Sequence, residues 1–266
     1  MSDPGELSWL FPNPQTQIPE IIRAVQGSML HIFWAQRYGV TLSEQRQSEV
    51  LLRPIHRKLQ RLQEIEPGPL DLARPPENRL VGNCRDFTLM TVSVLRNLGI
   101  SARSRCGFAN YFMPGHFEDH WVVEVWQTED KRWRMIDTQM DELQRSVLHL
   151  VFDPGDMPAG RFFCGGEAWQ MARGGQANPN DFGIFEWKGL DFIKGNLLRD
   201  ILALAQFEVL PWDAWGILET PFDHLSQEDI GLLDHAARVD VQADLPKIQD
   251  LIKGHPNFAA PAEWAD

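Results

Sequence analysis

Apolar residues recur at three- and four-residue steps in the first part of the chain, which is typical of amphipathic helices. Residues 18–38 carry such a pattern and predict a helix that ends at Gly39. A second helix is expected to begin at Thr41 or Ser43 as its N-cap and to run to about Ile65, before Pro67-Gly68-Pro69. The pattern therefore predicts a helical N-terminal segment.

The middle of the chain predicts one helix followed by strands. Residues 84–98 place apolar side chains on one face, and Gly99 follows as a good helix stop. Weak alternation over 101–108 and the Val- and Trp-rich runs 120–127 and 133–137 predict strands. The last two runs are joined by residues 128–131, a plausible hairpin connection, whereas 110–119 reads as a loop.

Beyond residue 142 the pattern is mostly helical. Helices are expected over 142–152, 168–172, 187–209, 226–237 and 244–253, and Ser226 with Asp229 fits a capping box. The Gly-rich stretch 154–175 is interpreted as a loop, in which Phe162–Gly166 forms an ordinary turn. These elements predict an α+β fold, with an N-terminal segment 1–76, a core 77–141 and a helical extension 142–266 docked on it as one globular unit.

Composition restricts the functions that this fold could serve. The 266 residues include 25 Lys and Arg against 37 Asp and Glu, a net charge of −12, which argues against nucleic acid as a partner. No run of 18 apolar residues exists, so no membrane segment is expected. The three cysteines form neither a disulfide framework nor a Cys-x-x-Cys site, and no signal peptide precedes them, so a cytoplasmic location is expected.

Three residues of the middle region have the types that nucleophilic catalysis needs. Cys84 begins the predicted helix, where unpaired N–H groups and the helix dipole stabilise a thiolate. His120 opens a strand 36 residues later, and Asp137 closes the next strand after 17 more. If the two strands pair through a turn near Glu129, with the midpoint at 128.5, His120 and Asp137 lie roughly opposite each other. Each residue alone has an ordinary structural explanation, but jointly they indicate a Cys-His-Asp triad.

Other candidates are weaker. His116 and His120, with Glu118 between them, have a zinc-like spacing only on a helix, and Pro114-Gly115 argues against one, so no metal and no cofactor are expected. Asp141 is a minor alternative to Asp137 as the residue that orients His120. Cys106 in a strand and Cys164 in the Gly-rich loop are interpreted as structural.

The residues around Cys84 resemble a known family. Residues 82–87 (Gly-Asn-Cys-Arg-Asp-Phe) and 95–103 are similar to the nucleophile helix of bacterial transglutaminase-like proteins. Residues 106–108, 120–125 and 133–137 are similar to the strands that follow it in this family. The resemblance covers about residues 78–140 and departs at Trp121, at Thr138, where Pro is common, and at Ser101.

The resemblance implies a papain-like fold in which the nucleophile helix packs on an antiparallel sheet, with additional N- and C-terminal helices. It also implies that 77–141 is the catalytic core, with Cys84 as nucleophile, His120 as general base and then acid, and Asp137 as the orienter of His120.

The expected reaction is acyl transfer from a small-molecule or peptide amide through a thioester on Cys84. The Cys84 N–H is the natural first oxyanion donor; the sequence does not identify the second, for which the loop 74–83 is a candidate. Hydrolysis by an amidase- or peptidase-like enzyme is favoured, because water is always available and no amine site can be read from the sequence. A biosynthetic or cross-linking acyltransferase and a non-catalytic peptide- or small-molecule-binding module stay open as alternatives. The sequence indicates no oligomeric state.

Overall fold

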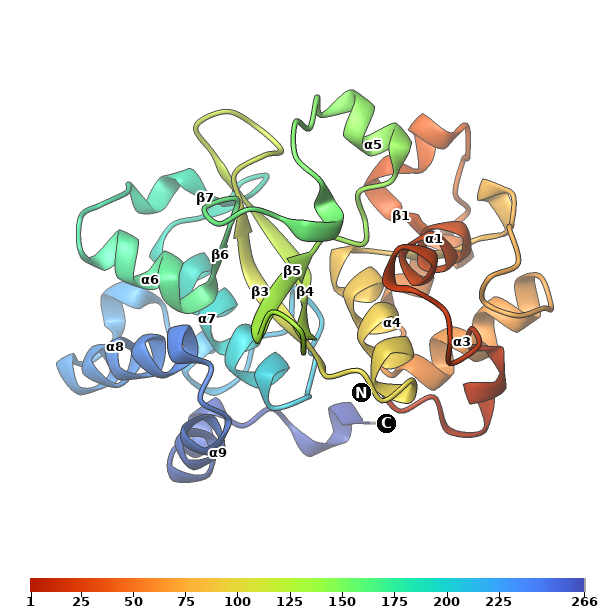
Figure 1. Cartoon of the computed structure of the whole chain (residues 1–266). Helices are drawn as coiled ribbons and strands as arrows, with labels where there is room; N and C mark the ends of the chain where they lie inside the picture. Colours follow the sequence, from red (N-terminus) through yellow and green to blue (C-terminus); the bar gives the residue numbers. More distant parts are fainter. Residues whose placement is uncertain (266) are drawn as a thin grey trace. The chain divides into compact units, whose positions relative to one another are not determined.

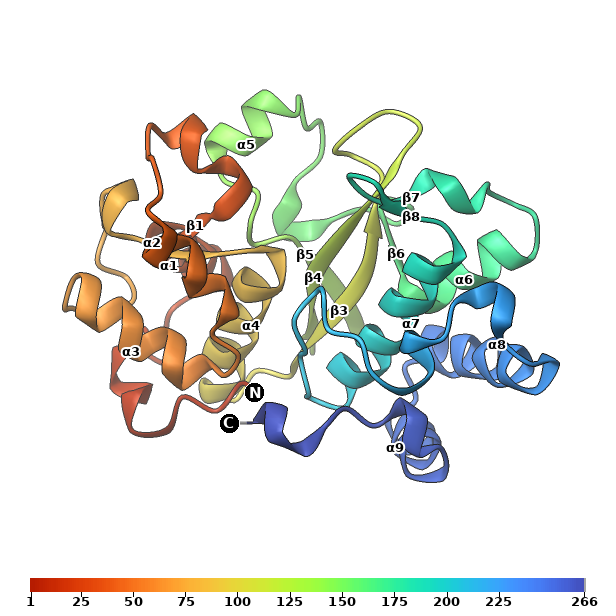
Figure 2. The ribbon, with the colours of Figure 1, turned by 180° about the vertical axis from the view of Figure 1, so that it is seen from behind.

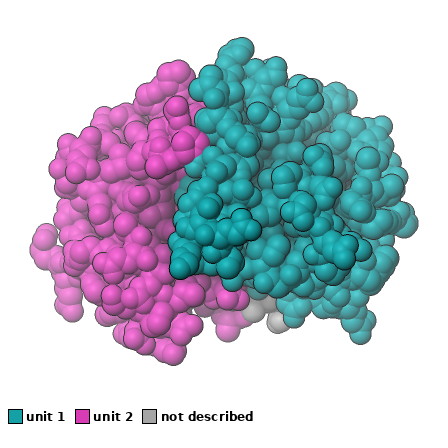
Figure 3. All heavy atoms as spheres, in the orientation of Figure 1, with its two compact units in different colours: residues 1–103, 122–157, 265–266 teal, residues 104–121, 158–264 magenta. Residues whose placement is uncertain are grey.

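The computed structural model describes residues 1–265 and has an α+β architecture (Figures 1 and 2), as the sequence predicts. The chain divides into two compact units, which Figure 3 shows in different colours. The first contains residues 1–103 and 122–157, and the second contains residues 104–121 and 158–264. None of the described helices is long and apolar enough to cross a membrane.

The helices of the first unit are mostly short. They are α1 (Ile18–Ser28), α2 (Glu44–Gln47), α3 (Ile55–Ile65), α4 (Cys84–Asn97) and α5 (Glu142–Val147), with 3-10 helices at Ile32–Tyr38 and Ser48–Leu51 among the connections. In both views α1, α3 and α4 lie side by side (Figures 1 and 2), and α4 contacts both α1 and α3. A two-stranded parallel sheet joins β1 (Met29–His31) to β2 (Leu80–Gly82).

Two predicted helices of this unit are wrong in extent. The helix expected over 18–38 ends at Ser28, because Met29–His31 pairs with β2 and then gives way to a 3-10 helix. The helix expected to reach Ile65 is broken into α2, a 3-10 turn and α3, since Pro54 precedes α3 and cannot continue a helix from the previous turn. The N-cap at Ser43 is confirmed: its side chain accepts the Arg46 N–H.

Helix α4 fits its prediction closely, and Gly99 follows it with a left-handed φ of 74°. The helix is buried from Cys84 to Leu95. Its apolar side chains share one core with α1 and α3 and with Val123, Val125 and Ile136 of two paired strands. These strands are β4 (Phe117–Gln127) and β5 (Arg132–Ile136), which run antiparallel. The expected packing of the nucleophile helix on an antiparallel pair is therefore present in the first unit.

The larger sheet has the strand order β6-β3-β4-β7-β8, with β5 paired to β4. Its other strands are β3 (Ala102–Ala109), β6 (Phe162–Cys164), β7 (Phe182–Ile184) and β8 (Trp187–Lys188), and β3 and β4 each run from one unit into the other. The turn predicted at 162–166 is wrong, because β6 pairs with β3 and Gly107 lies opposite Cys164. A Cβ at Gly107 would lie 2.1 Å from the Phe163 carbonyl oxygen, so this pairing requires glycine.

The second unit is built from helices around its own core. They are α6 (Gly165–Arg173), α7 (Leu190–Leu204), α8 (Gln227–Gln242) and α9 (Leu245–Gly254), and α6, α7 and α8 pack together (Figures 1 and 2). The capping box of Ser226 and Asp229 is confirmed. Helix α7 is shorter than predicted, because β8 and Gly189, with φ 90°, occupy its expected start, and α5 likewise ends at Val147 rather than 152.

Candidate active site

Cys84 is the first residue of α4 and is 8% exposed. The chain enters the helix directly from β2, and a Cβ at Gly82 would lie 2.7 Å from the Met29 side chain and 2.9 Å from Cβ of Asp86. Glycine is thus required for strand and helix to meet this closely. A helix N-terminus favours negative charge through its dipole and the N–H groups of its first turn, which favours a thiolate at this sulfur.

A buried charge cluster joins two residues of the same helical turn to Lys58 of α3. Asp86 Oδ1 contacts Lys58 Nζ at 2.9 Å and a guanidinium nitrogen of Arg85 at 3.0 Å. Its other oxygen accepts the Asn83 N–H at 3.0 Å. Lys58, Arg85 and Asp86 are all fully buried. Burial lowers the pKa of Lys58, and the neighbouring Asp86 carboxylate opposes that effect. We name these three side chains the α4 charge cluster.

A second carboxylate, that of Glu49, is near this cluster, and two arginines neutralise its charge. Glu49, 3% exposed, accepts the Val81 N–H at 2.8 Å. Its other oxygen contacts Arg46 at 2.8 Å and Arg61 at 3.0 Å. Glu49 therefore ties β2 to the preceding helical turns and adds no net negative charge to the region around the first turn of α4.

Asp137 follows β5 directly and is 1% exposed. Its N–H donates to the Pro154 carbonyl at 2.8 Å, and its Oδ1 accepts the Gln139 N–H at 3.0 Å. The next residue, Thr138, holds this segment against α4: its hydroxyl lies 3.0 Å from the Thr91 hydroxyl and 3.4 Å from the Phe87 carbonyl. The structure thus brings the Asp137 segment against the helix that Cys84 begins. The hydroxyl of Thr138 also explains a departure from the family pattern, since proline could not make these bonds.

Both carboxylate oxygens of Asp141 accept hydrogen bonds from other residues. One of its oxygens accepts the Gln144 N–H at 3.0 Å as the N-cap of α5, and the other accepts the Tyr38 hydroxyl at 2.6 Å. Burial and then this hydrogen bond raise the pKa of Tyr38. Both oxygens of Asp141 therefore have partners within the first unit.

His120 lies on β4, in the part of the strand that belongs to the second unit, and is 2% exposed. Two rings from the preceding loop pack edge-on against its imidazole. The Phe112 centroid lies 4.9 Å away at 67° and the Tyr111 centroid 6.0 Å away at 85°. The imidazole therefore has an aromatic, water-poor surrounding on this side, in which electrostatic interactions are strengthened.

The strand that carries His120 is held in place through its neighbour Asp119. The Asn196 amide of α7 donates to Asp119 Oδ1 at 2.8 Å and to the Gly107 carbonyl of β3 at 3.0 Å. Arg199 in turn donates to the side-chain oxygen Oδ1 of Asn196 at 3.0 Å. Burial raises the pKa of Asp119. Helix α7 thus holds both β3 and β4, and with them the position of His120.

The hairpin of β4 and β5 is confirmed, but its predicted register is wrong. Val123 lies opposite Ile136 and Gln127 opposite Arg132, so the turn is centred one residue later than predicted. Continuing this register by one step brings Asp137 opposite Val122 rather than opposite His120. His120 precedes Val122 by two residues on β4, and alternate residues of a strand share a face.

Among the described residues, one group has the spacing to hold a metal ion: Cys164, Asp200 and Asp240, whose ligand atoms lie within 4.8 Å of one another. A cation already serves these carboxylates. Arg105 contacts Asp200 Oδ2 at 2.7 Å and Asp240 Oδ2 at 3.7 Å. We name Arg105, Asp200 and Asp240 the α7–α8 charge cluster; its guanidinium contacts both carboxylates.

The zinc-like pair of His116 and His120 is not arranged for a metal on a helix, since His120 is in a strand and His116 in the loop before it. His116 Nε2 contacts Glu118 Oε2 at 3.1 Å and lies 3.2 Å from the Gly183 carbonyl. Burial raises the pKa of Glu118, while His116 opposes this.

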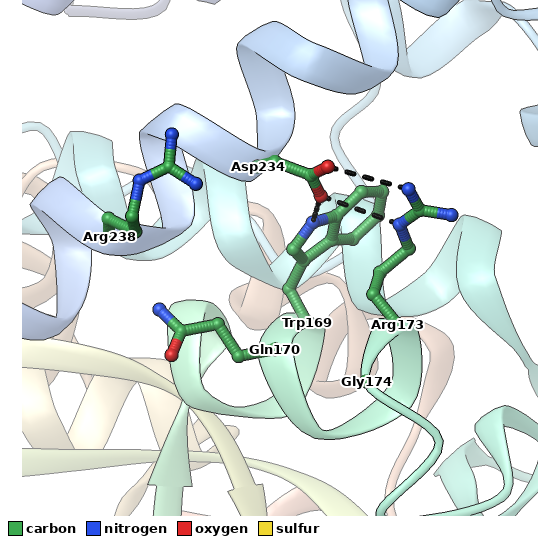
Figure 4. A pocket seen from close by; sticks show the side chains of 6 residues that line it. All are labelled: Trp169, Gln170, Arg173, Gly174, Asp234 and Arg238. Atoms are coloured by element: carbon green, nitrogen blue, oxygen red, sulfur yellow. Dashed lines mark hydrogen bonds and ion pairs between the residues drawn. The ribbon is translucent and has the colours of Figure 1, made fainter.

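A surface hollow of about 380 Å³ lies between α6 and α8 of the second unit. Figure 4 shows two of its lining residues, Trp169 and Arg173, both reaching Asp234. The Trp169 indole N–H donates to Asp234 at 2.8 Å, and Arg173 contacts it at 3.4 Å. None of Cys84, His120 and Asp137 lines this hollow, and its one carboxylate already has partners.

Comparison with known families agrees with the sequence resemblance. Residues 56–138 match the family model of the transglutaminase-like superfamily. The match contains Cys84, His120 and Asp137 and also Lys58 of α3. Searches among curated proteins and among solved structures gave no match.

Sequence reasoning overlooked Lys58, although a signal for it exists. Ile55, Lys58, Leu59 and Leu62 are the buried residues of α3 and recur at three- and four-residue steps. A lysine within the apolar stripe of a helix is rarely buried without a partner, so its position alone points to a buried carboxylate nearby.

Proposed function

We propose that this protein is a cysteine enzyme that transfers the acyl group of an amide or peptide through a thioester. Cys84 is the nucleophile, His120 removes the thiol proton and later protonates the leaving amine, and Asp137 orients the imidazole. The observation that carries the proposal is the placement of Cys84 at the N-terminus of a buried helix against which the Asp137 segment is hydrogen-bonded. The match of residues 56–138 to the transglutaminase-like superfamily supports it.

The register of β4 and β5 supports the roles of His120 and Asp137. Asp137 reaches the position opposite Val122, and His120 is the next residue on the same face of β4. A diagonal pair of this kind is within reach of an imidazole and a carboxylate. The remaining oxygen of Asp137 is then the acceptor for an imidazole N–H, since Oδ1 accepts the Gln139 N–H.

We further propose that water resolves the thioester, which makes the enzyme an amidase or peptidase. The Cys84 N–H at the start of α4 is one oxyanion donor. Acylation and hydrolysis need no metal ion in this scheme, because the helix N-terminus and the imidazole supply the charge stabilisation.

The rate of Cys84 alkylation by iodoacetamide as a function of pH, located by peptide mass spectrometry, tests the proposal. A thiolate–imidazolium pair predicts rapid alkylation well below the ordinary thiol pKa of about 8.5, and the loss of this low-pH reactivity in His120→Ala. Arg132→Ala, which alters an exposed ion pair with Asp156, is the matched control and should react like the wild type. An ordinary thiol profile in the wild type would overturn the proposed catalytic role.

A further inference from the structure

A series of hydrogen-bonded side chains leads away from the Asp137 carboxylate within the first unit. Asp137 Oδ1 accepts the Gln139 N–H at 3.0 Å. The Gln139 side-chain amide donates to Gln144 Oε1 at 3.0 Å, and the Gln144 side-chain amide donates to the Tyr38 hydroxyl at 3.2 Å. Tyr38 then donates to Asp141 Oδ2 at 2.6 Å. We name the side chains of Gln139, Gln144 and Tyr38 the amide network.

The amide network closes on the segment that contains Asp137. The Asp141 N–H donates to the Gln139 carbonyl at 2.9 Å, and Asp141 Oδ1 accepts the Gln144 N–H at 3.0 Å. Gln139 is 3% exposed and Gln144 is 1% exposed. A closed and buried set of hydrogen bonds leaves the Gln139 backbone little freedom, because a displacement breaks bonds where water does not reach to replace them.

The amide network also has a fixed direction from donor to acceptor. A tyrosine hydroxyl has one proton, and that of Tyr38 goes to Asp141; burial and then this hydrogen bond raise the pKa of Tyr38, so the proton is retained. The Gln144 atom that faces the hydroxyl is therefore the amide nitrogen, and its oxygen faces Gln139. The orientation of the Gln139 amide is thus set from Asp141, through two side chains.

This orientation has a cost in stability. The Gln139 nitrogen faces Gln144, and Gln139 Oε1 is buried without a hydrogen-bond partner among the described residues. A buried oxygen without a partner costs about 1–3 kcal/mol. Apolar side chains at these positions would avoid this cost, so stability alone does not explain the amide network.

We propose that Gln144 is a positioning residue for Asp137: through Gln139 it keeps Asp137 Oδ1 on the Gln139 N–H, so that the second carboxylate oxygen stays available to an imidazole. This inference rests on the proposed role of Asp137 as the orienter of His120. Groups of a catalytic site must be held to within about 0.5 Å, and hydrogen bonds from residues behind them supply this precision.

The other bonds of this segment hold its main chain rather than the carboxylate. The Asp137 N–H donates to the Pro154 carbonyl at 2.8 Å. The Gln26 amide donates to the Thr138 carbonyl at 3.2 Å, and the Thr138 hydroxyl bonds to α4. These contacts fix where residues 137 and 138 lie, whereas the Gln139 N–H contacts Asp137 Oδ1 itself.

Three variants and one control test the proposal. Gln144→Met keeps the length of the side chain and removes both of its amide contacts. Tyr38→Phe removes one hydroxyl group and is the milder change. Asp137→Asn removes the carboxylate that Gln144 is proposed to position. Gln63→Met is the matched control, because the Gln63 amide also bridges two groups of the first unit: it donates to the Gly68 carbonyl at 2.6 Å and accepts the Gly68 N–H at 3.1 Å.

The experiment measures kcat and KM for the hydrolysis of p-nitrophenyl acetate. We expect Gln144→Met to lower kcat about tenfold with KM unchanged, because a misplaced group slows the reaction whereas Gln144 is not proposed to touch the substrate. Tyr38→Phe should lower kcat by a smaller factor. Gln63→Met should retain the wild-type kcat.

The double variant distinguishes positioning from a structural role. If Gln144 acts through Asp137, adding Gln144→Met to Asp137→Asn lowers kcat by less than about twofold, because the positioned group is already lost. A structural role would give the same factor in both backgrounds. Equal losses in the wild type and in Asp137→Asn would therefore overturn the proposal.

The outcomes also separate this inference from the proposed function. An Asp137→Asn variant with full kcat would contradict the proposed function. If Asp137→Asn loses activity while Gln144→Met and Tyr38→Phe keep it, the role of Asp137 stands and that of Gln144 is overturned. If Gln144→Met does not fold, Tyr38→Phe provides the same comparison, alone and combined with Asp137→Asn.

Discussion

Each unit of the molecule contains a buried charge cluster, and the two have opposite composition. In the α4 charge cluster two cations share one carboxylate, Asp86. In the α7–α8 charge cluster two carboxylates share one cation: Arg105 binds Asp200 through both Nε and Nη2 and lies 3.7 Å from Asp240. Within these contacts cations outnumber carboxylates in the first cluster, and carboxylates outnumber cations in the second.

We expect the two clusters to act differently on the cysteine that is associated with each. Cys84 begins the helix whose first turn contains Arg85 and Asp86 of the α4 charge cluster. Cys164 lies within 4.8 Å of the ligand oxygens of Asp200 and Asp240, and burial and then Asp240 raise the pKa of its thiol well above the ordinary value. Since both cysteines are buried, we expect local charge, rather than burial alone, to distinguish the reactivities of the two thiols.

The largest expected effect comes from removing the single cation of the α7–α8 charge cluster. Arg105→Met leaves Asp200 and Asp240 without a positive partner, and we expect it to lower the free energy of unfolding by about 3–5 kcal/mol. Urea unfolding followed by circular dichroism measures this loss.

Lys58→Met is the comparison for that variant. Arg85 and the Asn83 N–H still serve Asp86 after the change, so the expected loss is smaller, about 1–2 kcal/mol. Equal losses in the two variants would contradict the view that one cluster has a surplus cation and the other has none.

The next effect concerns the thiols. At pH 7 we expect iodoacetamide to label Cys84 at least about 100-fold faster than Cys164, because the thiolate is the reactive form. Peptide mass spectrometry after timed quenching measures both rates in one sample. In denaturant the two rates should converge, and comparable labelling in the folded protein would refute the comparison.

The pH dependence of the free energy of unfolding tests the second carboxylate of the α7–α8 charge cluster, that of Asp240. Burial and then Asp200 raise the pKa of Asp240 well above its ordinary value. The folded state then holds a proton that the unfolded state has lost, so stability falls as pH rises from about 4 towards the folded pKa, by about 1.4 kcal/mol per unit. Asp240→Asn should flatten this fall, as measured by urea unfolding from pH 4 to 8. An unchanged slope would show that Asp240 is ionised throughout.

The smallest effect is expected at the surface hollow of the second unit. Asp234 and Arg173 form a partly exposed ion pair at 3.4 Å, and Asp234→Asn retains an acceptor for the Trp169 indole N–H. We expect a stability change below about 1 kcal/mol, since exposed ion pairs contribute little. A loss as large as that of Arg105→Met would mean that burial does not set the strength of these pairs.

The sequence predicted the elements that depend on local pattern. Helix α4, the hairpin of β4 and β5 and the capping box of α8 all follow from spacing, turn residues and caps close in the chain. Elements that depend on distant partners were missed. Strand β1 forms because it pairs with β2 about 50 residues later, and β6 because it pairs with β3.

The candidate site also combines features that local pattern predicts with features that depend on distant partners. Cys84, His120 and Asp137 were singled out from residue type and position at element ends. The alternation of strands indicated a hairpin, but its register depended on the turn and differed by one residue at its centre. The contacts of Lys58 with Asp86 and of Thr138 with α4 join distant segments, and no local pattern predicts which partner each would find.

The division of the chain at residues 76 and 141 stays a prediction. The compact units show a different grouping, in which residues 122–157 return to the first unit. Transglutaminase-like similarity covers residues 56–138, which includes α3 and so reaches further towards the N-terminus than the sequence resemblance alone.

Acylation of Cys84 is the most direct test of the central claim. The protein is mixed with p-nitrophenyl acetate, a small activated ester, and the acetyl group is located by peptide mass spectrometry while nitrophenol release is followed. We predict acetylation of Cys84 and its turnover by water, with turnover lost in Cys84→Ala and in His120→Ala. Acetylation confined to other residues, or a Cys84→Ala variant with the full rate of nitrophenol release, would contradict the account.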